Sequence, residues 1–348
     1  MSRTLLAALL LAGLASPAHA DILVGNYGGG KTPESLHAFA DDANGDAAPI
    51  RALGGPASTL VSAAGGSYEA NEGVLYVADF FGQAIRVYPA YANGDVAPLR
   101  VLDAPLLGQV RSVAIDVAHD ELLTTNSGCC LAAYPRTASG TDYPLRSLSW
   151  GGIPGSQTQL NYPSSIAYAP GRDEVLLADS DAGGPKILVF DRGQTDAYAP
   201  PRRVLKGNLT GFGDWIGGIA LDPGNHLLYV ATYTTNPDAT RSGRILVFAD
   251  DAGGNVAPLR TIAGPSTQLD TANSAFLFGL AVDPLRRRLI ASVQDGTLAS
   301  GNALLVWSLD ASGDAAPLQA IRGNQTGMLA IGAPIWVPAD AIFADSFD

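Results

Sequence analysis

The sequence predicts an all-β protein built as a six-bladed β-propeller, with four antiparallel strands in each blade. The first observation is a motif that begins as ANGDAAPIR (Ala43–Arg51) and recurs with its proline at positions 49, 98, 144, 200, 258 and 317. Six copies at intervals of 46 to 59 residues indicate a repeat architecture. The second is that each repeat contains four short apolar runs. The third is that no segment keeps helical spacing of apolar residues over a dozen positions.

The fifth repeat shows how the four strands are recognised. It contains GIALDP (Gly218–Pro223), LLYVAT (Leu227–Thr232), RILVFA (Arg244–Ala249) and PLRTI (Pro258–Ile262). Each run is rich in Val, Ile, Leu or Tyr and is bounded by Gly, Pro, Asn or Asp, which is typical of strands separated by turns. Four such strands in each of six tandem units are the sequence pattern of a propeller.

The two ends of the chain are expected to share one blade and so close the ring. DILVGN (Asp21–Asn26) aligns with the second strands of the other repeats, and SLHAFA (Ser35–Ala40) aligns with the third strands. The missing first strand should then come from Gly332–Val337. AIFADS (Ala341–Ser346) also resembles a second strand, and it could compete with DILVGN or lie outside the ring. We therefore expect a propeller over residues 21–338 and a tail over 339–348.

The first 20 residues have the pattern of a signal peptide. Arg3 supplies the positive charge, Leu5–Leu14 the apolar core, and Ala18–Ala20 a small-x-small cleavage site. The apolar run is too short to span a bilayer, and no cysteine lies near the cleavage site for a lipid anchor. We expect a secreted or periplasmic monomer without a membrane span.

The charge of the chain narrows the possible partners. The formal net charge is −12, and it becomes −13 once Arg3 leaves with the signal peptide. Such an acidic chain is not expected to bind nucleic acid or anionic membranes. It is compatible with binding of a cation such as Ca²⁺ or Mg²⁺.

The recurring motif is interpreted as structural. Its Asn-Gly, Gly-Gly or Ser-Gly pair supplies the turn between the third and fourth strands. Its proline should begin the outer strand, where a missing N–H is tolerated, and its arginine should add charge to that edge. A calcium loop is the alternative, because Asp42, Asn44 and Asp46 alternate as they do at the start of such loops.

A binding site is expected on one face of the ring. We call it the loop-rich face. It carries the loops between the second and third strands and the loops between blades, and these loops differ from repeat to repeat. The opposite face, which we call the short-turn face, carries the remaining turns and the motif. Variable loops on a rigid frame often carry function. The second strands end there in polar residues, which should ring the mouth of the central channel: Asn26, Asp79, Asn126, Asp179, Thr232 with Tyr233, and Gln294–Asp295. Their oxygens suit Ca²⁺ or Mg²⁺, or each side chain caps its own turn.

Aromatic residues and the two cysteines also lie in these loops. Trp150 and Trp215, with Phe212, Phe276 and Phe278, could stack on a sugar or an aromatic ligand, or could fill gaps between blades. Cys129 and Cys130 are adjacent, and an oxidising compartment favours a disulfide between them. Such a bridge would be strained, since neighbouring Cα atoms are only about 3.8 Å apart. Two free thiols or an intermolecular bridge are the alternatives.

Catalytic patterns are scarce in this sequence. His119 and His226 are expected in turns of the short-turn face, and His37 in or beside a third strand, so none should reach the channel mouth as a general base. Zinc-ligand spacing, phosphate-binding loops and a G-x-S-x-G elbow are absent from the sequence. The leading hypothesis is a binding module for a small molecule, a glycan or a protein.

The repeats resemble a known family, and this resemblance extends over nearly the whole chain after residue 20. Two stretches show it most clearly. GIALDPGNHLLYVATY and SIAYAPGRDEVLLADSD, each followed by an ILVF strand, resemble NHL-type repeats and the wider group of six-bladed propellers. That group includes metal-dependent lactonases of the gluconolactonase type. The resemblance therefore implies a second hypothesis, a divalent-metal lactonase-like hydrolase in which Asn126 and Asp179 match two metal ligands by strand position.

Overall fold

The structure is a computed structural model of the whole chain. It describes residues 20–27, 36–126, 130–180, 183–270, 276–294 and 301–339, apart from the side chain of Phe278. The predicted signal peptide before Ala20 and the AIFADS segment lie outside the described residues.

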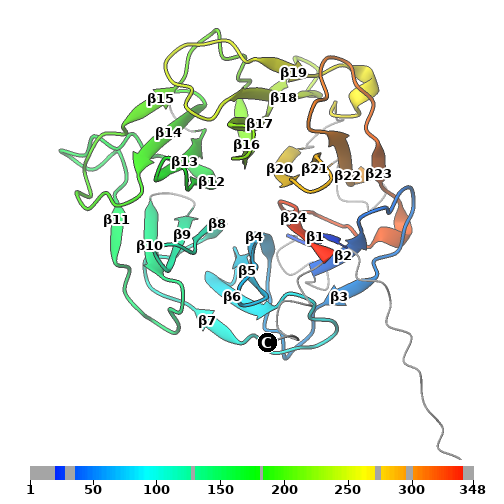
Figure 1. Cartoon of the computed structure of the whole chain (residues 1–348), viewed down its shortest axis with the longest axis horizontal. Coiled ribbons are helices and arrows are strands. Elements are labelled where there is room, and N and C mark those ends of the chain that lie inside the picture. Colours follow the sequence, from blue (N-terminus) through cyan, green and yellow to red (C-terminus); the bar gives the residue numbers. More distant parts are fainter. Residues whose placement is uncertain are drawn as a thin grey trace, which may run out of the picture.

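Six four-stranded antiparallel sheets form a closed ring around a central channel, as Figure 1 shows. The strands of each blade run in order from the channel to the rim. Blade 1 comprises β24 (Ile335–Val337), β1 (Asp21–Gly25), β2 (Leu36–Ala40) and β3 (Arg51–Leu53). Blade 2 comprises β4 (Ala63–Glu69), β5 (Val74–Asp79), β6 (Ala84–Pro89) and β7 (Arg100–Leu102). Blade 3 comprises β8 (Val110–Asp116), β9 (Glu121–Asn126), β10 (Leu131–Pro135) and β11 (Arg146–Leu148).

The other three blades repeat this order. Blade 4 comprises β12 (Pro163–Ala169), β13 (Glu174–Asp179), β14 (Lys186–Asp191) and β15 (Arg203–Leu205). Blade 5 comprises β16 (Trp215–Asp222), β17 (Leu227–Thr235), β18 (Arg241–Ala249) and β19 (Arg260–Ile262). Blade 6 comprises β20 (Phe276–Asp283), β21 (Arg288–Gln294), β22 (Ala303–Ser308) and β23 (Gln319–Ile321). Short 3-10 helices follow β19 and β23, η1 (Pro265–Thr267) and η3 (Asn324–Thr326).

The predicted closure of the ring is confirmed. β24 pairs antiparallel with β1, with Ile22 opposite Trp336, and a further bridge joins Asn26 to Ile331. Blade 1 thus combines one C-terminal strand with three N-terminal strands. The two ends of the ring hold each other through a sheet, so the blade cannot form without both.

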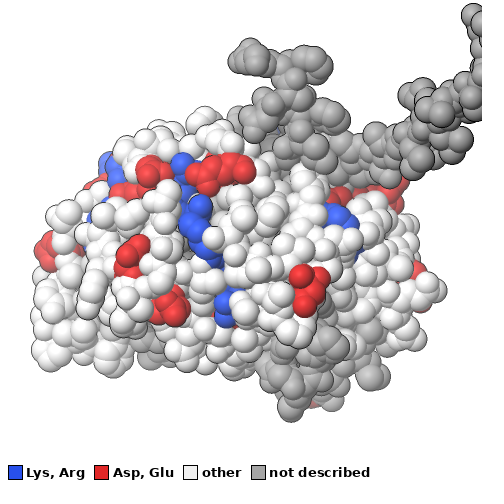
Figure 2. All heavy atoms as spheres, turned by 90° about the horizontal axis from the view of Figure 1, so that it is seen from below, with Lys and Arg blue, Asp and Glu red and all other residues white. Residues whose placement is uncertain are grey.

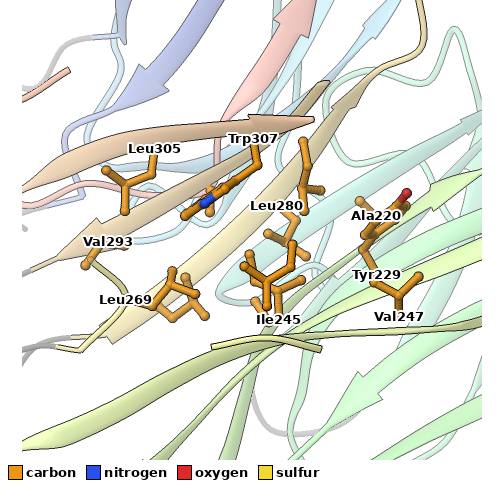
Figure 3. Packing of buried hydrophobic residues seen from close by; sticks show 14 of the residues in the cluster. Ala220, Tyr229, Ile245, Val247, Leu269, Leu280, Val293, Leu305 and Trp307 are labelled. Atoms are coloured by element: carbon orange, nitrogen blue, oxygen red, sulfur yellow. The ribbon is translucent and has the colours of Figure 1, made fainter. Parts of the chain in front are cut away.

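The core lies between neighbouring blades. The third strands contribute their largest side chains to it, and Phe190, Phe248 and Trp307 are each about 99% buried, with 1% of their surface exposed. Figure 3 shows Trp307 of blade 6 packed in the same cluster as Tyr229 and Ile245 of blade 5. Burying an aromatic or aliphatic side chain of this size contributes about 1.5–3 kcal/mol, so the blade interfaces supply the main stabilisation.

Each first strand of blades 2 to 6 contains a β-bulge near its start. The pairing register shifts around Ala64, Arg111, Ser164, Gly217 and Phe278. A bulge inserts one extra residue, bends the strand and redirects a side chain. In this ring, the redirected positions lie at the end of the channel where the first strands begin.

The motif turn binds the preceding blade, which the sequence did not reveal. Its glycine forms a parallel bridge with the outer strand before it, as Gly94 does with Leu53 and Gly313 with Ile262. The motif aspartate of blade 2, Asp95, accepts hydrogen bonds from the backbone of Ala57 and Ser58 in the loop that leaves blade 1. The motif therefore runs along the rim and reaches the loops between blades, instead of staying on the short-turn face.

The motif arginine also joins blades and is not simply an edge charge. Arg146 donates to both carboxylate oxygens of Glu121 in its own blade at 2.5 and 2.6 Å. Its Nε and Nη2 donate to the backbone carbonyl of Arg192 in the next blade. Four of the fourth strands begin at this arginine, two residues after the motif proline, whereas β15 begins at Arg203 and β23 at Gln319. The proline itself precedes the strand in every repeat.

The loops between blades share a pattern that the sequence analysis missed. In four of them a buried Ser or Thr hydroxyl donates to the carbonyl of the glycine three residues earlier, at 2.6 to 2.7 Å: Ser58 to Gly55, Thr210 to Gly207, Thr267 to Gly264 and Thr326 to Gly323. The loops differ from repeat to repeat, but four of them share this first turn. The remaining variation lies further along each loop.

The side of the ring in Figure 2 mixes charges and exposes much uncharged surface. A short run of basic side chains crosses the middle of this view, with acidic side chains beside it. Within the described part of the chain, no helix is long and apolar enough to cross a membrane.

Candidate functional site

A cavity of about 400 Å³ lies at one mouth of the central channel. It is on the loop-rich face, because its lining comes from the starts of first strands and the ends of second strands. The lining residues are Tyr27, Arg111, Tyr162, Trp215, Gly217, Tyr233, Phe276, Leu277 and Gln294. Five blades contribute to it directly.

Three aromatic lining residues occupy equivalent positions in successive blades. Tyr162, Trp215 and Phe276 each lie two residues before the bulge of their first strand. Tyr162 and Trp215 pack edge to face with ring centroids 5.3 Å apart. The sequence analysis named Trp215 and Phe276 as aromatic candidates but missed Tyr162. Aligning the three repeats at their first strands would have shown an aromatic residue at the same position in each.

A second set of lining residues lies at the ends of the second strands. Tyr27 follows Asn26 after β1, Tyr233 lies within β17 opposite Trp215, and Gln294 ends β21 opposite Phe276. Neighbouring residues of a strand point to opposite sides. Tyr27 and Tyr233, one position beyond Asn26 and Thr232, therefore line the cavity, whereas Asn26 and Thr232 do not. The sequence analysis named Tyr233 and Gln294 at this mouth and did not name Tyr27.

Arg111 enters the cavity from the bulge of β8. Its guanidinium carbon lies 5.0 Å from the ring centroid of Phe80 and 4.9 Å from that of Tyr162, and its Nη2 donates to the Tyr162 hydroxyl. Phe80 in turn packs against Tyr27, with centroids 5.1 Å apart. Stacking on two rings holds the guanidinium in place. Sequence reasoning missed Arg111 because it stands just before the run read as a first strand.

The hairpin of β17 and β18 forms one wall of the site. These strands have nine residues each, longer than any other strand in the described chain. Tyr233 and Phe276 pack edge to face at 5.9 Å, and the Arg241 guanidinium lies over both rings at 4.7 and 4.1 Å. The wall is thus built from blades 5 and 6 together.

Small residues bring the first strands close together below the cavity. A Cβ on Gly218 would lie 2.7 Å from the Cα of Gly279, and a Cβ on Gly279 would lie 2.4 Å from the Cβ of Ala333 and 2.7 Å from its Cα. Only glycine fits where two backbones approach so closely. A second cavity of about 390 Å³ begins beyond these residues, toward the short-turn face.

Two of the predicted polar strand ends hold ion pairs inside their own blades. Asp79 is fully buried and receives the Nε of Arg86 at 2.6 Å and the backbone N–H of Ser62 at 2.6 Å. Asp179 is also fully buried and accepts from Lys186 at 2.8 Å. Its second oxygen accepts from the backbone of Asn161 and Tyr162 at 2.7 and 2.9 Å.

The other polar strand ends bind the loop that enters the same blade. Asn26 donates to the Gly327 carbonyl at 3.1 Å, and Asn126 donates to the Leu106 carbonyl at 2.8 Å. Thr232 donates to the Trp215 carbonyl at 2.6 Å. Asp295 lies outside the described residues. The described members of this set fix the chain that enters their blade, whereas the alternative offered from the sequence was a cap on their own turn, which Asn126 also forms by accepting from the Cys130 N–H.

The donor set at Asn126 and Asp179 does not fit a metal of the lactonase type. Both oxygens of Asp179 are used by Lys186 and two backbone N–H groups, and Lys186 balances its charge. Both ends of the Asn126 amide bond the loops on either side of it. No reaction step through a metal is derived at these residues.

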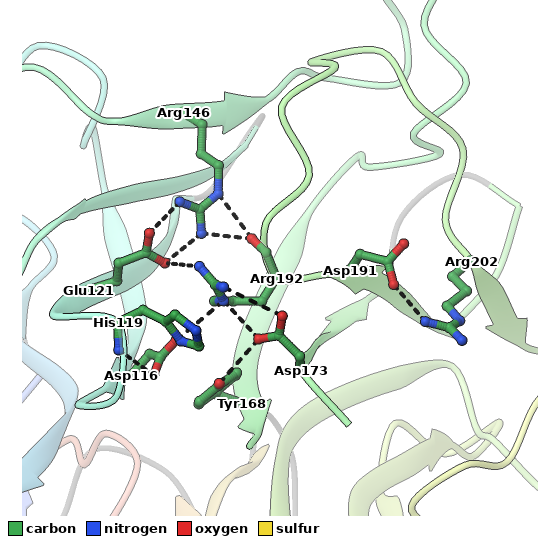
Figure 4. Close-up of polar contacts among 9 residues, drawn as sticks. All are labelled: Asp116, His119, Glu121, Arg146, Tyr168, Asp173, Asp191, Arg192 and Arg202. Atoms are coloured by element: carbon green, nitrogen blue, oxygen red, sulfur yellow. Dashed lines mark hydrogen bonds and ion pairs between the residues drawn. The ribbon is translucent and has the colours of Figure 1, made fainter. Parts of the chain in front are cut away.

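The described residues hold one close group of potential ligands, at the opposite end of the channel. Asp116, His119 and Asp173 lie within 4.8 Å of one another. Figure 4 shows the guanidinium of Arg192 among them, 2.7 Å from Asp173 and 3.4 Å from Asp116. The same guanidinium contacts Glu121 at 3.2 Å. Arg192 supplies the positive charge that this group requires, so the group is an ion-pair network between blades 3 and 4.

Trp150 and Cys130 lie at a separate groove of about 360 Å³ on the loop-rich face. Leu106, Trp150 and Ile153 line it and are 44%, 43% and 37% exposed. Cys130 is disulfide-bonded, but Cys129 lies outside the described residues, so the vicinal bridge stays a prediction. Phe212 instead packs on Phe248 in the core.

The described histidines lie away from the cavity, as expected from the sequence. His119 and His226 occupy turns between first and second strands. His37 lies in β2 and its ring bonds to the Thr326 carbonyl at 3.1 Å. His37 therefore contributes to ring closure, since it contacts the last inter-blade loop.

Comparisons with known proteins identify the fold. No protein-family model matches the chain, and no curated protein matches it. Among solved structures, it is similar to a chain of the nidogen/laminin complex, with a TM-score of 0.63 and 14% identity over 92% of this chain and 99% of that chain. It is also similar to Kuenenia stuttgartiensis hydrazine synthase, with a TM-score of 0.53 and 11% identity over 79% of this chain and 71% of that chain. At these identities the likeness shows a six-bladed β-propeller.

Proposed function

We propose that this protein is a non-catalytic binding module that holds a small organic ligand in the channel-mouth cavity. One observation carries the proposal: aromatic side chains from four blades converge on a single cavity of about 400 Å³, namely Tyr27, Tyr162, Trp215, Tyr233 and Phe276. Ligand sites typically have this size and combine an apolar lining with a few polar groups. Aromatic faces at such a site stack on flat rings or sugar rings.

The lining chemistry favours binding over catalysis. None of the described lining residues is a carboxylate, a histidine, a cysteine or a serine that could act as a base or a nucleophile. Burial raises the pKa of Tyr27 to about 12, although the charge of Arg111 opposes this. The Tyr27 phenol therefore stays protonated at neutral pH and can donate a hydrogen bond.

We also propose that the protein is exported and that its propeller repeats are of the NHL type. The signal-peptide pattern ends at Ala20, and β1 begins at Asp21, which is buried and paired with Arg51. Cleavage at this point would leave the first blade intact. We further propose that the protein is a monomer in the periplasm or outside the cell.

The test is a fluorescence titration of the full chain with ring-bearing compounds, both sugars and aromatics. The Trp215→Ala substitution should weaken binding about 10-fold or more, because the ligand ring can no longer stack on the indole. Trp150→Ala is the matched control, since Trp150 lies in the separate groove, and it should leave affinity unchanged. Equal losses in both variants, or no binding by any compound, would contradict the proposal. If the purified protein contains stoichiometric Ca²⁺ or Mg²⁺, and a chelator removes both the metal and a lactone-hydrolysing activity, the lactonase-like hydrolase would be favoured over the binding module.

Protein binding is the second candidate function. The groove beside Leu106, Trp150 and Ile153 exposes three large apolar side chains on the same face, and such exposed patches often mark protein contacts. Loss of a protein contact in Trp150→Ala, with small-ligand binding intact, would favour this candidate.

A further inference from the structure

The outer edge of blade 3 is open, whereas the outer edges of the other five blades are covered. In those five blades the motif glycine of the next blade forms a parallel bridge with the last residue of the outer strand: Leu53 with Gly94, Leu102 with Gly140, Leu205 with Gly254, Ile262 with Gly313 and Ile321 with Gly45. Each glycine N–H also donates to the carbonyl of the middle residue of that strand, at 2.7 to 2.9 Å. Within the described chain, β11, the outermost strand of blade 3 (Figure 1), has neither contact.

This difference leaves the backbone of Ser147 open on its outer side. β11 pairs with β10 in the same register in which β3 and β7 pair with their neighbours. The N–H and carbonyl of its middle residue, Ser147, therefore point away from the sheet, as those of Ala52 and Val101 do. The next blade still accepts the Ser149 N–H at its Ala197 carbonyl, at 2.9 Å, but no described residue bonds the outer side of Ser147. An open strand edge of this kind is a template for pairing with another strand.

The sequence of blade 4 explains why the edge is open. Its bond with Ser149 shows that Ala197 stands where the motif glycine stands in the other blades. The five glycines have φ between 55° and 77°, a left-handed conformation that alanine disfavours and that Ala197 does not adopt. The turn therefore keeps its carbonyl contact but does not bring an N–H to Ser147. Tyr198 follows Ala197, at a position filled by Asp or Asn in four other motifs.

Apolar side chains gather beside the same edge. Trp150 stands two residues after β11. Four other outer strands have at that position a glycine with φ of 128° to 141°: Gly55, Gly207, Gly264 and Gly323. Trp150 lines the groove of about 360 Å³ together with Leu106, Ile153 and the two edge residues Ser147 and Ser149. Its three large apolar side chains are 37% to 44% exposed. The open backbone and the apolar groove thus coincide at one blade.

We propose that the outer edge of blade 3 binds an extended peptide segment of a partner protein by strand addition. A backbone N–H of the segment takes the place of the missing motif glycine and donates to the Ser147 carbonyl, and a carbonyl of the segment accepts from the Ser147 N–H. The fold itself indicates this occupant, because a backbone segment covers the same edge in the other five blades. Alternate side chains of an added strand point to one side, and here the apolar ones lie in the groove.

This inference rests on the second candidate function, protein binding, and specifies the segment and how it binds. Main-chain hydrogen bonds supply affinity in strand addition, and pockets for alternate side chains supply specificity. The channel-mouth cavity shares no lining residue with the groove. Binding of a small ligand in that cavity is therefore a separate question, and its outcome does not decide this one.

The experiment starts with a display library of random peptides of about nine residues, the length of a long strand, panned on the immobilised full chain. We expect enriched peptides with apolar residues at alternate positions. Their binding is measured by fluorescence anisotropy, and each peptide amide is then N-methylated in turn. Methylation of the amides that face β11 should weaken binding about 10-fold or more, whereas the amides between them, which point away, should tolerate it.

Variants of the protein test the same contacts. Ser147→Pro removes the outward N–H and should abolish binding, while proline is tolerated at an edge whose N–H faces away from the sheet. Trp150→Gly introduces the residue found in four other loops and should weaken binding about 10-fold or more. Leu259→Ala is the matched control, since Leu259 is 64% exposed on the rim of blade 5, and it should leave binding unchanged. Urea denaturation checks that each variant is folded.

The outcomes separate strand addition from other kinds of docking. A library without enriched peptides, or peptides that tolerate N-methylation at every position, overturns strand addition. Protein binding at the groove still stands in either case if Trp150→Ala loses a protein contact. Peptides that bind Ser147→Pro and Trp150→Gly as tightly as the original protein lie elsewhere, which also overturns the proposal. Self-association of the full chain that Ser147→Pro abolishes would make a second copy the occupant and would exclude a separate partner.

Discussion

Replacing Gly264 with alanine is expected to loosen the contact between blades 5 and 6. Gly264 precedes η1 with φ 130° and ψ 169°, a conformation almost restricted to glycine. A Cβ there would lie 2.5 Å from Oδ1 of Asp314 in the motif of blade 6. That carboxylate accepts from the backbone N and the hydroxyl of Ser266 at 2.7 and 3.0 Å.

The expected loss follows from these contacts. The backbone conformation costs a non-glycine residue about 1–3 kcal/mol. Displacing the Asp314 carboxylate removes two hydrogen bonds, each worth about 1 kcal/mol at this exposed position. The free energy of unfolding should therefore fall by about 3–5 kcal/mol. Gly313→Ala is the matched control: its φ is +65° with no atom within 4 Å of a Cβ, so it should lose only about 1–2 kcal/mol.

Urea denaturation monitored by circular dichroism measures the difference. The double variant Gly264→Ala with Asp314→Ala tests the coupling, because removing the carboxylate also removes the steric conflict. The loss caused by Gly264→Ala should be smaller in that background. Equal losses for Gly264→Ala and Gly313→Ala, or strictly additive effects in the double variant, would refute the role of the motif turn as a contact between blades.

Two further predictions concern buried charges and pH. Asp179→Ala leaves Lys186 buried without its carboxylate, so the free energy of unfolding should drop by about 3–5 kcal/mol, and a loss below about 1 kcal/mol in denaturation would contradict the buried ion pair. Burial lowers the pKa of His37 below its ordinary value of 6.5, although the hydrogen bond to the Thr326 carbonyl opposes this. The unfolded chain then takes up a proton before the folded chain does, so stability should be full above pH about 6.5 and decrease as pH falls toward the lowered pKa. His37→Gln should flatten this decrease in thermal denaturation, and an unchanged pH profile would contradict the assignment.

The strand pattern was predictable because it is encoded locally and repeated. Runs such as Leu227–Thr232 carry strand composition between turn residues, and β17 contains that run. The closing strand was predictable by counting, since blade 1 lacked a first strand, and β24 lies within the expected segment. The motif turn was identified, but its binding to the preceding blade was not, because contacts such as that of Asp95 with Ala57 join residues 38 positions apart.

The candidate site was predictable in its face but not in most of its residues. The polar strand ends Asp79 and Asp179 stood out in the sequence, yet they satisfy loops and ion pairs of their own blades. Tyr27, one position after a polar end, lines the cavity instead. Successive side chains of a strand point to opposite faces, so an error of one residue in the alignment places the wrong side chain in the cavity. The sequence alone did not fix this alignment at the strand ends.

The sequence by itself determined the six repeats, the four strands of each blade and the closure of the ring, because strand periodicity and turn chemistry act over a few residues. Only the tertiary structure decided which side chains meet at the channel mouth. Arg111, Trp215 and Phe276 come from three blades and share one cavity. Their meeting depends on the bulges of β8, β16 and β20 and on closure of the whole ring. Local sequence patterns do not encode distances between blades, so the site emerges only when the six sheets are packed together.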